Sequence, residues 1–211
     1  MVEENYIDTP FYPNKMGRVF LLTLRDVLLL DGYTDLLKRT GLSHFAQARP
    51  ADNWAKEFDF NYVSILNQGI EELYGPRGGR RLALLAGQKF FEFGWGEFGT
   101  LAGLSDVALK ARSLQVKLKT GLVSIARLIT QVSDQTTWVE EQARYFEYHV
   151  GVCPVCWNRV VDEPVCFHTI GFLQGALFWF SSGLDFRIRQ TSCIAMGEEQ
   201  CIFRIDMEPI K

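Results

Sequence analysis

The chain has 211 residues, of which 47% are hydrophobic and 22% charged, with a formal net charge of -3. This length suits one well-buried domain. The acidic balance excludes the basic surface field on which non-specific nucleic-acid binding depends, and no apolar run reaches the ~20 residues of a membrane span. The opening residues, MVEENYIDTP, do not resemble a signal peptide. We therefore expect a cytoplasmic protein with no nucleic-acid partner and no membrane span.

Apolar spacing in the first part of the chain predicts helices. After an extended lead-in over residues 1–17, a very apolar helix is expected over 18–30, either buried or in a subunit interface. Asp31 and Gly32 interrupt it. A short helix follows over 33–39, with Gly41 in the left-handed conformation of a C-terminal cap. Residues 45–54 are expected as a loop.

Three more helices are expected: from Asp59 or Asn61 to Gly75, over 82–93, and from Ser105 or Asp106 to about 132. Between the first two lies GPRGGRR, whose free amides and arginines could hold an anion, although a solvated turn is the commoner outcome. The G-x-G-x-x-G match over 94–99 follows a helix instead of a strand, so it does not indicate a dinucleotide site.

The periodicity changes after Asp134. Residues 136–150 alternate as two strands, 167–180 form a helix stopped by Gly183, and 186–195 with 201–207 form a hairpin. The order of elements predicts an α+β fold with helices packed on one face of a mainly antiparallel sheet. We expect one domain over residues 1–211, with a helical front (about 15–133) and a strand-rich, cysteine-containing rear (about 135–208).

All five cysteines lie in the rear half: Cys153, Cys156, Cys166, Cys193 and Cys201. In a reducing compartment such a group indicates metal ligands or redox groups. Hairpin pairing would bring Cys193 opposite Cys201, and structural zinc needs four thiolates at ~2.3 Å. We therefore predict a closed structural zinc site without a catalytic role, with scattered buried thiols and a redox or disulfide role as the alternatives.

The 16 Phe and 5 Trp are many rings to bury and suggest an apolar ligand cavity. Ordinary core packing is the alternative for most of them, and a structural role is the alternative for His168. The candidate ligand-binding residues are Trp138, Tyr145, Phe146, His149, His168, Phe178 and Trp179.

The C-terminal part resembles the 4-vinyl reductase domain family. The matching residues are P-V-C at 164–166, the glycine pair Gly171 and Gly175, the strand from Gln190 to Cys193, and C-x-F at 201–203. The resemblance implies an α+β fold like that of TRAPP small subunits, a dimer and a hydrophobic pocket. Family members are associated with bacteriochlorophyll synthesis or form phenol-sensing domains.

In the sensor branch of that family, zinc is held by the counterparts of Cys166, Cys193 and Cys201 and by an acidic residue where this chain has Gln190. Because an amide is a poor zinc ligand, we expect a cysteine of the C-x-x-C pair to replace it. The predicted metal ligands are therefore Cys156, Cys166, Cys193 and Cys201, with Cys153 as the alternate.

The resulting hypothesis is a zinc-stabilised homodimer that binds a hydrophobic or aromatic molecule, a tetrapyrrole pigment precursor being one candidate, as sensor, carrier or assembly factor. The alternative is a reductase of a tetrapyrrole vinyl group in bacteriochlorophyll synthesis. That reaction needs a redox cofactor, and the chain has no nicotinamide or flavin motif in a credible context. A purely structural subunit is a third possibility.

Overall fold

A computed structural model describes residues 9–98 and 112–210 of the chain. A small sheet pairs β1 (Phe11–Pro13) with β2 (Lys56–Asp59), and a four-stranded antiparallel sheet has the order β3-β4-β6-β5. The strands of the larger sheet are β3 (Thr137–Glu141), β4 (Tyr145–Val150), β5 (Phe186–Ser192) and β6 (Cys201–Pro209). The helices are α1 (Asn14–Arg39), α2 (His44–Gln47), α3 (Phe60–Phe98), α5 (Leu114–Val132), α6 (Phe167–Ser181) and the 3-10 turn η2 (Ile194–Met196).

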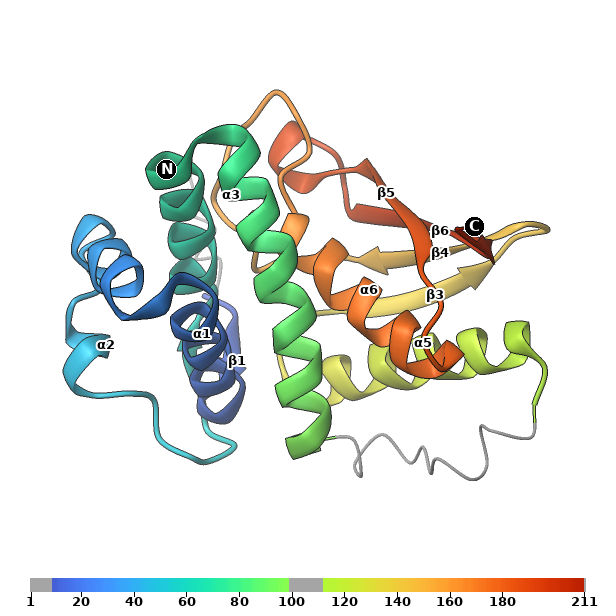
Figure 1. Ribbon diagram of the computed structural model, residues 1–211, viewed down its shortest axis with the longest axis horizontal. Coiled ribbons are helices and arrows are strands. Elements are labelled where there is room, and N and C mark those ends of the chain that lie inside the picture. The colour runs from blue at the N-terminus through green and yellow to red at the C-terminus, as the bar shows by residue number, and fades with distance from the viewer. Residues whose placement is uncertain (1–8, 99–111, 211) are drawn as a thin grey trace, which may run out of the picture.

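The helices form layers on one side of the larger sheet (Figure 1). α5 and α6 lie against the sheet, α3 packs along α6, and α1 packs on α3. The predicted α+β architecture is thus confirmed. None of the helices within the described residues is long and apolar enough to cross a membrane.

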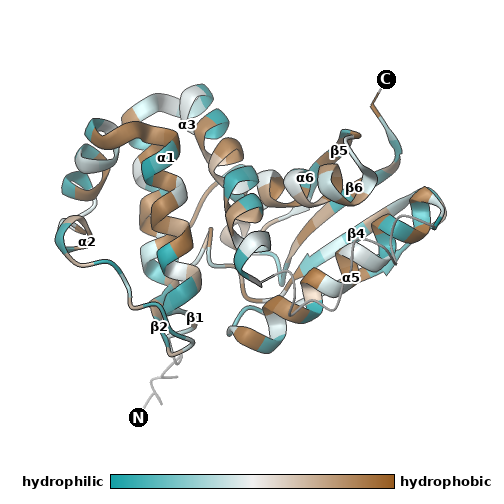
Figure 2. Cartoon of the chain, turned by 60° about the horizontal axis from the view of Figure 1, so that its bottom comes forward, coloured by the Kyte–Doolittle hydropathy of each residue, from teal (hydrophilic) through white to brown (hydrophobic). Residues whose placement is uncertain are grey.

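The strands follow the predicted alternation. Phe146, Phe203 and Ile205 are fully buried on the inner face of the sheet, where β4 and β6 pair Phe146 with Ile205. α5 carries its apolar residues at three- and four-residue steps, with Leu118, Leu122 and Ile125 buried. Figure 2 shows both hydrophobic and hydrophilic residues along α5, as expected for a helix with one buried face.

The first helix begins and breaks earlier than predicted. α1 starts at Asn14, within the expected lead-in, and it kinks at Leu29, where φ is 59°. The break therefore precedes Asp31 and Gly32 and leaves the Leu29 side chain exposed. Gly41 has φ +73°, which confirms the left-handed cap. The expected loop after it contains the short helix α2.

The Gly-rich segment GPRGGRR is helical, which corrects the predicted turn. Only Gly75 departs from helical geometry, with φ 71°. Pro76 follows directly, and proline is well tolerated in the first turn of a new helical segment. Arg80 lies over the Phe167 ring at 4.3 Å instead of facing an anion. The helix continues through residues 94–98, so no dinucleotide loop forms there, while Gly99 and the predicted start at Ser105 or Asp106 lie outside the described residues.

Glycines allow α3 and α6 to approach closely. An added Cβ at Gly87 of α3 would lie 2.0 Å from the carbonyl oxygen of His168. One at Gly171 of α6 would lie 2.0 Å from the carbonyl oxygen of Leu84. Real Cβ atoms do not approach backbone so closely, so the crossing depends on the missing side chains.

Gly171→Ala is expected to destabilise the protein, because the methyl group would force two helix backbones apart. Overpacking of this kind costs ~1–3 kcal/mol. The control is Gly96→Ala on α3, where the added Cβ meets nothing within 4 Å, so that better helix propensity should leave stability equal or higher. Urea unfolding measures the free energy of unfolding of each variant. Equal values for Gly171→Ala and Gly96→Ala would contradict the close crossing of α3 and α6.

Candidate functional site

Four cysteine sulfurs meet in the buried interior of the rear half. The Sγ atoms of Cys153, Cys156, Cys166 and Cys201 all lie within 4.8 Å of one another. The Sγ···Sγ distances are 3.6 Å for Cys153–Cys166, 3.5 Å for Cys156–Cys201 and 3.9 Å for Cys166–Cys201. Tetrahedral metal–sulfur bonds of ~2.3 Å separate the sulfurs by about 3.8 Å. The four thiols therefore have the spacing of a tetrahedral metal site.

The four sulfurs come from three parts of the local fold. Cys153 and Cys156 follow β4, Cys166 is the N-cap of α6, and Cys201 begins β6. Gln190 of β5 supports the cluster, since its Oε1 accepts a 3.0 Å hydrogen bond from the Cys166 backbone N–H. The amide thus fixes a cysteine in place and does not act as a ligand.

Cys193 lies outside this set of four. β5 ends at Ser192, which pairs with Ile202, and Cys193 is the N-cap of η2. The Cys193 thiol still lies near enough to those of Cys156, Cys166 and Cys201 to interact with them. Val150 of β4 is the register partner of Cys201. The structure therefore brings Cys153 into the group where the sequence favoured Cys193.

The clustered thiols do not ionise alike. Hydrogen bonds from Cys153, Cys166, Cys193 and Cys201 lower the pKa of Cys156 far below its ordinary value. Burial, together with the neighbouring cysteines, raises the pKa of Cys166 well above it. The neighbouring thiols therefore stabilise one thiolate in the cluster. Burial and repulsion between like charges oppose the ionisation of a second cysteine unless a cation binds to the cluster.

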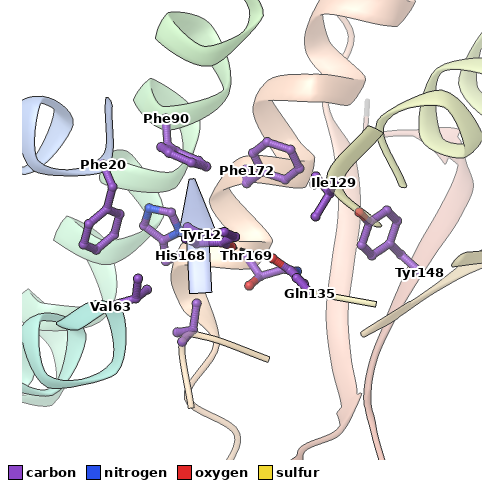
Figure 3. A pocket seen from close by; sticks show the side chains of 11 residues that line it. Tyr12, Phe20, Val63, Phe90, Ile129, Gln135, Tyr148, His168, Thr169 and Phe172 are labelled. Atoms are coloured by element: carbon purple, nitrogen blue, oxygen red, sulfur yellow. Dashed lines mark hydrogen bonds between the residues drawn. The ribbon is translucent and has the colours of Figure 1, made fainter. Parts of the chain in front are cut away.

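A separate small cavity of about 20 Å³ lies between the helical front and the sheet. Figure 3 shows His168 of α6 between Phe20 of α1 and Phe90 of α3, with ring centroids 5.2 and 5.4 Å away. His168 is only 5% exposed, and its Nε2 has no hydrogen-bond partner among the described residues. Burial lowers the pKa of His168 to about 3, so the ring is neutral at physiological pH.

Four further residues with polar side chains complete the lining of this cavity: Tyr12, Gln135, Tyr148 and Thr169. Tyr12 of β1 donates a short hydrogen bond to Gln135 Oε1, across 123 positions of sequence, and Thr169 lies next to His168. The hydroxyl of Tyr148 is buried and makes no hydrogen bond of normal geometry, and burial raises its pKa. The cavity therefore offers two unpartnered polar atoms, on His168 and Tyr148.

Nothing in the sequence marked Tyr12 and Gln135 as site residues. They are far apart in the chain and belong to no motif, so only the folded arrangement reveals them. Phe20 and Phe90 follow the spacing of ordinary core residues.

The predicted ligand-binding residues do not share one site. His168 alone among them lines the central cavity. Phe178 and Trp179 line a surface hollow of about 690 Å³ beside α3, and Phe146 is a core residue. Trp138 and His149 stack on each other on the sheet, and Tyr145 lies under Arg204.

No family model matches the chain, and no curated protein matches it in sequence. Solved structures do match. An H-NOX protein from S. oneidensis in the Fe(II)NO ligation state has a TM-score of 0.58 at 14% identity, over 92% of this chain and 99% of that chain. The chain has the H-NOX fold. A Cs H-NOX mutant with an unnatural amino acid gives 0.60 at 13% identity, over 94% and 98%. A structure probing heme distortion in the H-NOX family gives 0.59 at 14% identity, over 94% and 97%.

These comparisons correct the expected family. The 4-vinyl reductase resemblance is wrong, because no such family matches and the structural neighbours are H-NOX proteins. The functions expected from that family are therefore wrong as well. These are the zinc-stabilised binder of a hydrophobic ligand or pigment precursor, the vinyl reductase alternative and the link to bacteriochlorophyll synthesis. Zinc as the cofactor is likewise unsupported, since the comparisons concern heme.

The interior cavities enclosed by residues 9–98 and 112–210 do not fit a heme. Pockets for drug-sized ligands measure ~300–1,000 Å³, whereas the cavity at His168 measures about 20 Å³ and the adjoining one at Phe90 and Trp95 about 40 Å³. The surface hollow of about 690 Å³ is large enough, but its lining contains no histidine, cysteine, methionine or tyrosine to ligate iron. Among the described residues, the small cavity that contains His168 and this larger hollow are therefore in different places.

His168 should make stability depend on pH. Its folded-state pKa of about 3 lies below the ordinary 6.5, so the folded protein binds fewer protons than the unfolded chain between these values. The stability that neutral His168 contributes to the folded state is fully present above pH ~6.5. It is lost as the pH falls toward 3, by up to ~1.4 kcal/mol per pH unit.

Urea unfolding across this pH range tests the effect. His168→Leu should remove this part of the slope, whereas His44→Gln, at an exposed position, should keep it. Equal slopes for wild type and His168→Leu would show that His168 is not a buried neutral histidine.

Proposed function

We propose that this chain is a sensory domain that takes a small uncharged molecule into the cavity beside His168. The observation that carries the proposal is the unpartnered Nε2 of His168, buried against that cavity. A buried polar atom left without a partner costs ~1–3 kcal/mol. A ligand that bonds to this nitrogen recovers that cost.

The size of the cavity limits the ligand. One water molecule needs ~10–15 Å³ on the same scale, so a cavity of about 20 Å³ admits a molecule of two or three heavy atoms. Diatomic gases belong to this size class. H-NOX structures in Fe(II)NO and Fe(II)CO ligation states support a gas-sized ligand by analogy of fold, and no heme is part of the proposal.

The position of the cavity suits a sensor. Its walls come from α1 and α3 on one side and from α6 and the sheet on the other. The Tyr12–Gln135 hydrogen bond crosses the same boundary. If the helices α1 and α3 can lie at two different distances from α6 and the sheet, a ligand that binds one arrangement more tightly shifts the equilibrium toward it. The size of the shift equals the difference between its two affinities.

We also propose that the domain acts as a cytoplasmic homodimer. Leu29 and Leu30, at the kink of α1, are 72% and 60% exposed. Exposed large aliphatic side chains are typical of protein–protein contacts, which supports the burial of Leu29 and Leu30 against a second copy of the chain.

Carbon monoxide is a suitable probe of the cavity. In NMR spectra of the wild-type protein, dissolved CO should shift the ring signals of His168, Phe20 and Phe90 in a saturable way. Val63→Leu places an extra methylene in the cavity lining and should abolish the response. Val19→Leu, equally buried but away from the cavity, should retain it.

A titration with hemin provides the opposing test. No stoichiometric complex is expected, because the interior lacks the space. One heme bound per chain, with its absorption changed by His168→Leu, would overturn the proposed ligand size. An unchanged spectrum of the protein under CO would overturn the cavity as the ligand site.

We further propose that Cys153, Cys156, Cys166 and Cys201 hold one thiolate-preferring metal ion that staples the rear half. The near-tetrahedral sulfur spacing supports this. The Sγ atoms of Cys156 and Cys201 are 3.5 Å apart. A disulfide between them would require this distance to shrink to ~2.05 Å.

Cadmium, a thiolate-preferring ion, tests the cluster. The reduced, metal-free protein should bind one Cd²⁺ per chain, and Cys153→Ser should weaken binding at least ~10-fold, as loss of even supporting residues does. Cys193→Ser should have a much smaller effect, because Cys193 lies outside the set of four. The reverse order of the two variants would contradict the assignment.

A further inference from the structure

Two glutamates and a histidine meet on the outer face of the sheet, away from the cysteine cluster and the cavity. In the register of β3 and β4, Trp138 is opposite His149 and Glu140 is opposite Glu147. The two carboxylates and the imidazole nitrogen lie within 4.8 Å of one another.

The imidazole is buried but lacks a partner on one side. His149 is 5% exposed, and its Nε2 makes no hydrogen bond within the part of the chain that the structure describes. This nitrogen lies 3.9 Å from Glu140 Oε1 and 3.9 Å from Glu147 Oε2. These distances are too long for hydrogen bonds. They leave room for an ion between the three atoms after a small contraction.

Neighbouring groups hold the ring in the orientation that a metal ligand needs. The Nδ1 of His149 lies 3.3 Å from Gln200 Oε1, and because that oxygen can only accept, Nδ1 carries the hydrogen. The lone pair is therefore on Nε2. The indole of Trp138 stacks on the ring at 4.9 Å with an interplanar angle of 10°.

The carboxylates are also oriented. Trp138 Nε1 donates to Glu140 Oε1 at 3.2 Å, and Gln142 Nε2 donates to Glu147 Oε2 at 3.4 Å. Such outer contacts are typical of metal sites, where they fix the direction of each ligand.

The charges in this region call for a cation. Like charges directly opposite each other on neighbouring strands destabilise a sheet, and Glu140 and Glu147 are such a pair. Arg204, the β6 partner of Glu147, forms its ion pair with Asp206 at 3.6 Å and lies over the Tyr145 ring. It does not neutralise the two glutamates.

We propose that Glu140, Glu147 and His149 bind a divalent transition-metal ion. One imidazole nitrogen with two carboxylate oxygens suits first-row ions such as Mn²⁺, Fe²⁺ and Co²⁺, whereas thiolate-preferring ions select cysteine. Glu140 is exposed, so water molecules complete the coordination on that side. The site would fasten β3 to β4 from the solvent face.

Manganese is the probe of choice, because Mn²⁺ favours oxygen and nitrogen ligands and does not compete for the cysteine cluster. Electron paramagnetic resonance of free Mn²⁺ measures how much the full chain removes from solution. One Mn²⁺ per chain is expected, with selective broadening of the His149 ring signals in NMR spectra.

Variants that keep side-chain size but remove charge distinguish a specific metal site from a general attraction of cations to an acidic surface. Glu140→Gln and Glu147→Gln should each weaken Mn²⁺ binding at least ~10-fold. Glu141→Gln is the matched control, because Glu141 lies on the same strand but pairs with Lys119 at 2.6 Å; it should leave binding unchanged. His149→Phe keeps the stacked ring and removes the nitrogen.

Two results would overturn the proposal. The absence of Mn²⁺ binding would mean that Glu140, Glu147 and His149 do not form a metal site. Equal weakening in Glu140→Gln and Glu141→Gln would mean that Mn²⁺ is attracted only by surface charge. The Glu→Gln variants preserve side-chain size at partly or fully exposed positions, so the comparison does not depend on His149→Phe folding.

Discussion

The close crossing of α3 and α6 is the constraint on which the rest of the structure depends. Glycines at 87 and 171 let each helix touch the backbone of the other. α6 begins at the cysteine cluster and carries His168 in its first turn. The same contact therefore positions a cysteine of the cluster at one end of α6 and the imidazole of His168 beside the cavity. A wider crossing would separate His168 from Phe20 and Phe90 and open the interior to water.

The cysteine cluster and the cavity are close enough to influence each other. Cys166 and His168 are two residues apart, and burial followed by the charge of Cys153 raises the pKa of Tyr12, which lines the cavity. A cation at the four sulfurs would offset that charge. The state of the cluster thus changes the electrostatic environment of the cavity, and no other contact is required.

The relation to H-NOX proteins is one of fold. The chain matches these structures over nearly its whole length at about 14% identity, and the two interior cavities among its described residues measure about 20 and 40 Å³. Phe20, Phe90, Phe172 and His168 occupy the boundary between front and rear. One fold can house sites of different size, and these four side chains line the small cavity of this chain.

Local periodicity and composition determined much of this protein. Alternation predicted the strands that became β3 to β6, three- and four-residue spacing predicted the main helices, and Gly41 was expected in its left-handed cap. These features depend on short-range geometry, which a single sequence displays. The clustering of cysteines in the rear was equally visible. Glu140 and Glu147, however, were missed, because cross-strand register is needed to place them beside His149.

Only the tertiary structure decided which side chains meet. The choice of Cys153 over Cys193 follows from η2, which takes Cys193 out of the strand after Ser192. The kink at Leu29 has no glycine or proline to announce it. Tyr12 and Gln135 join across 123 positions because β1 docks beside the end of α5. Such contacts depend on how complete layers pack, and neither periodicity nor motif spacing encodes that arrangement in a form that can be read along the chain.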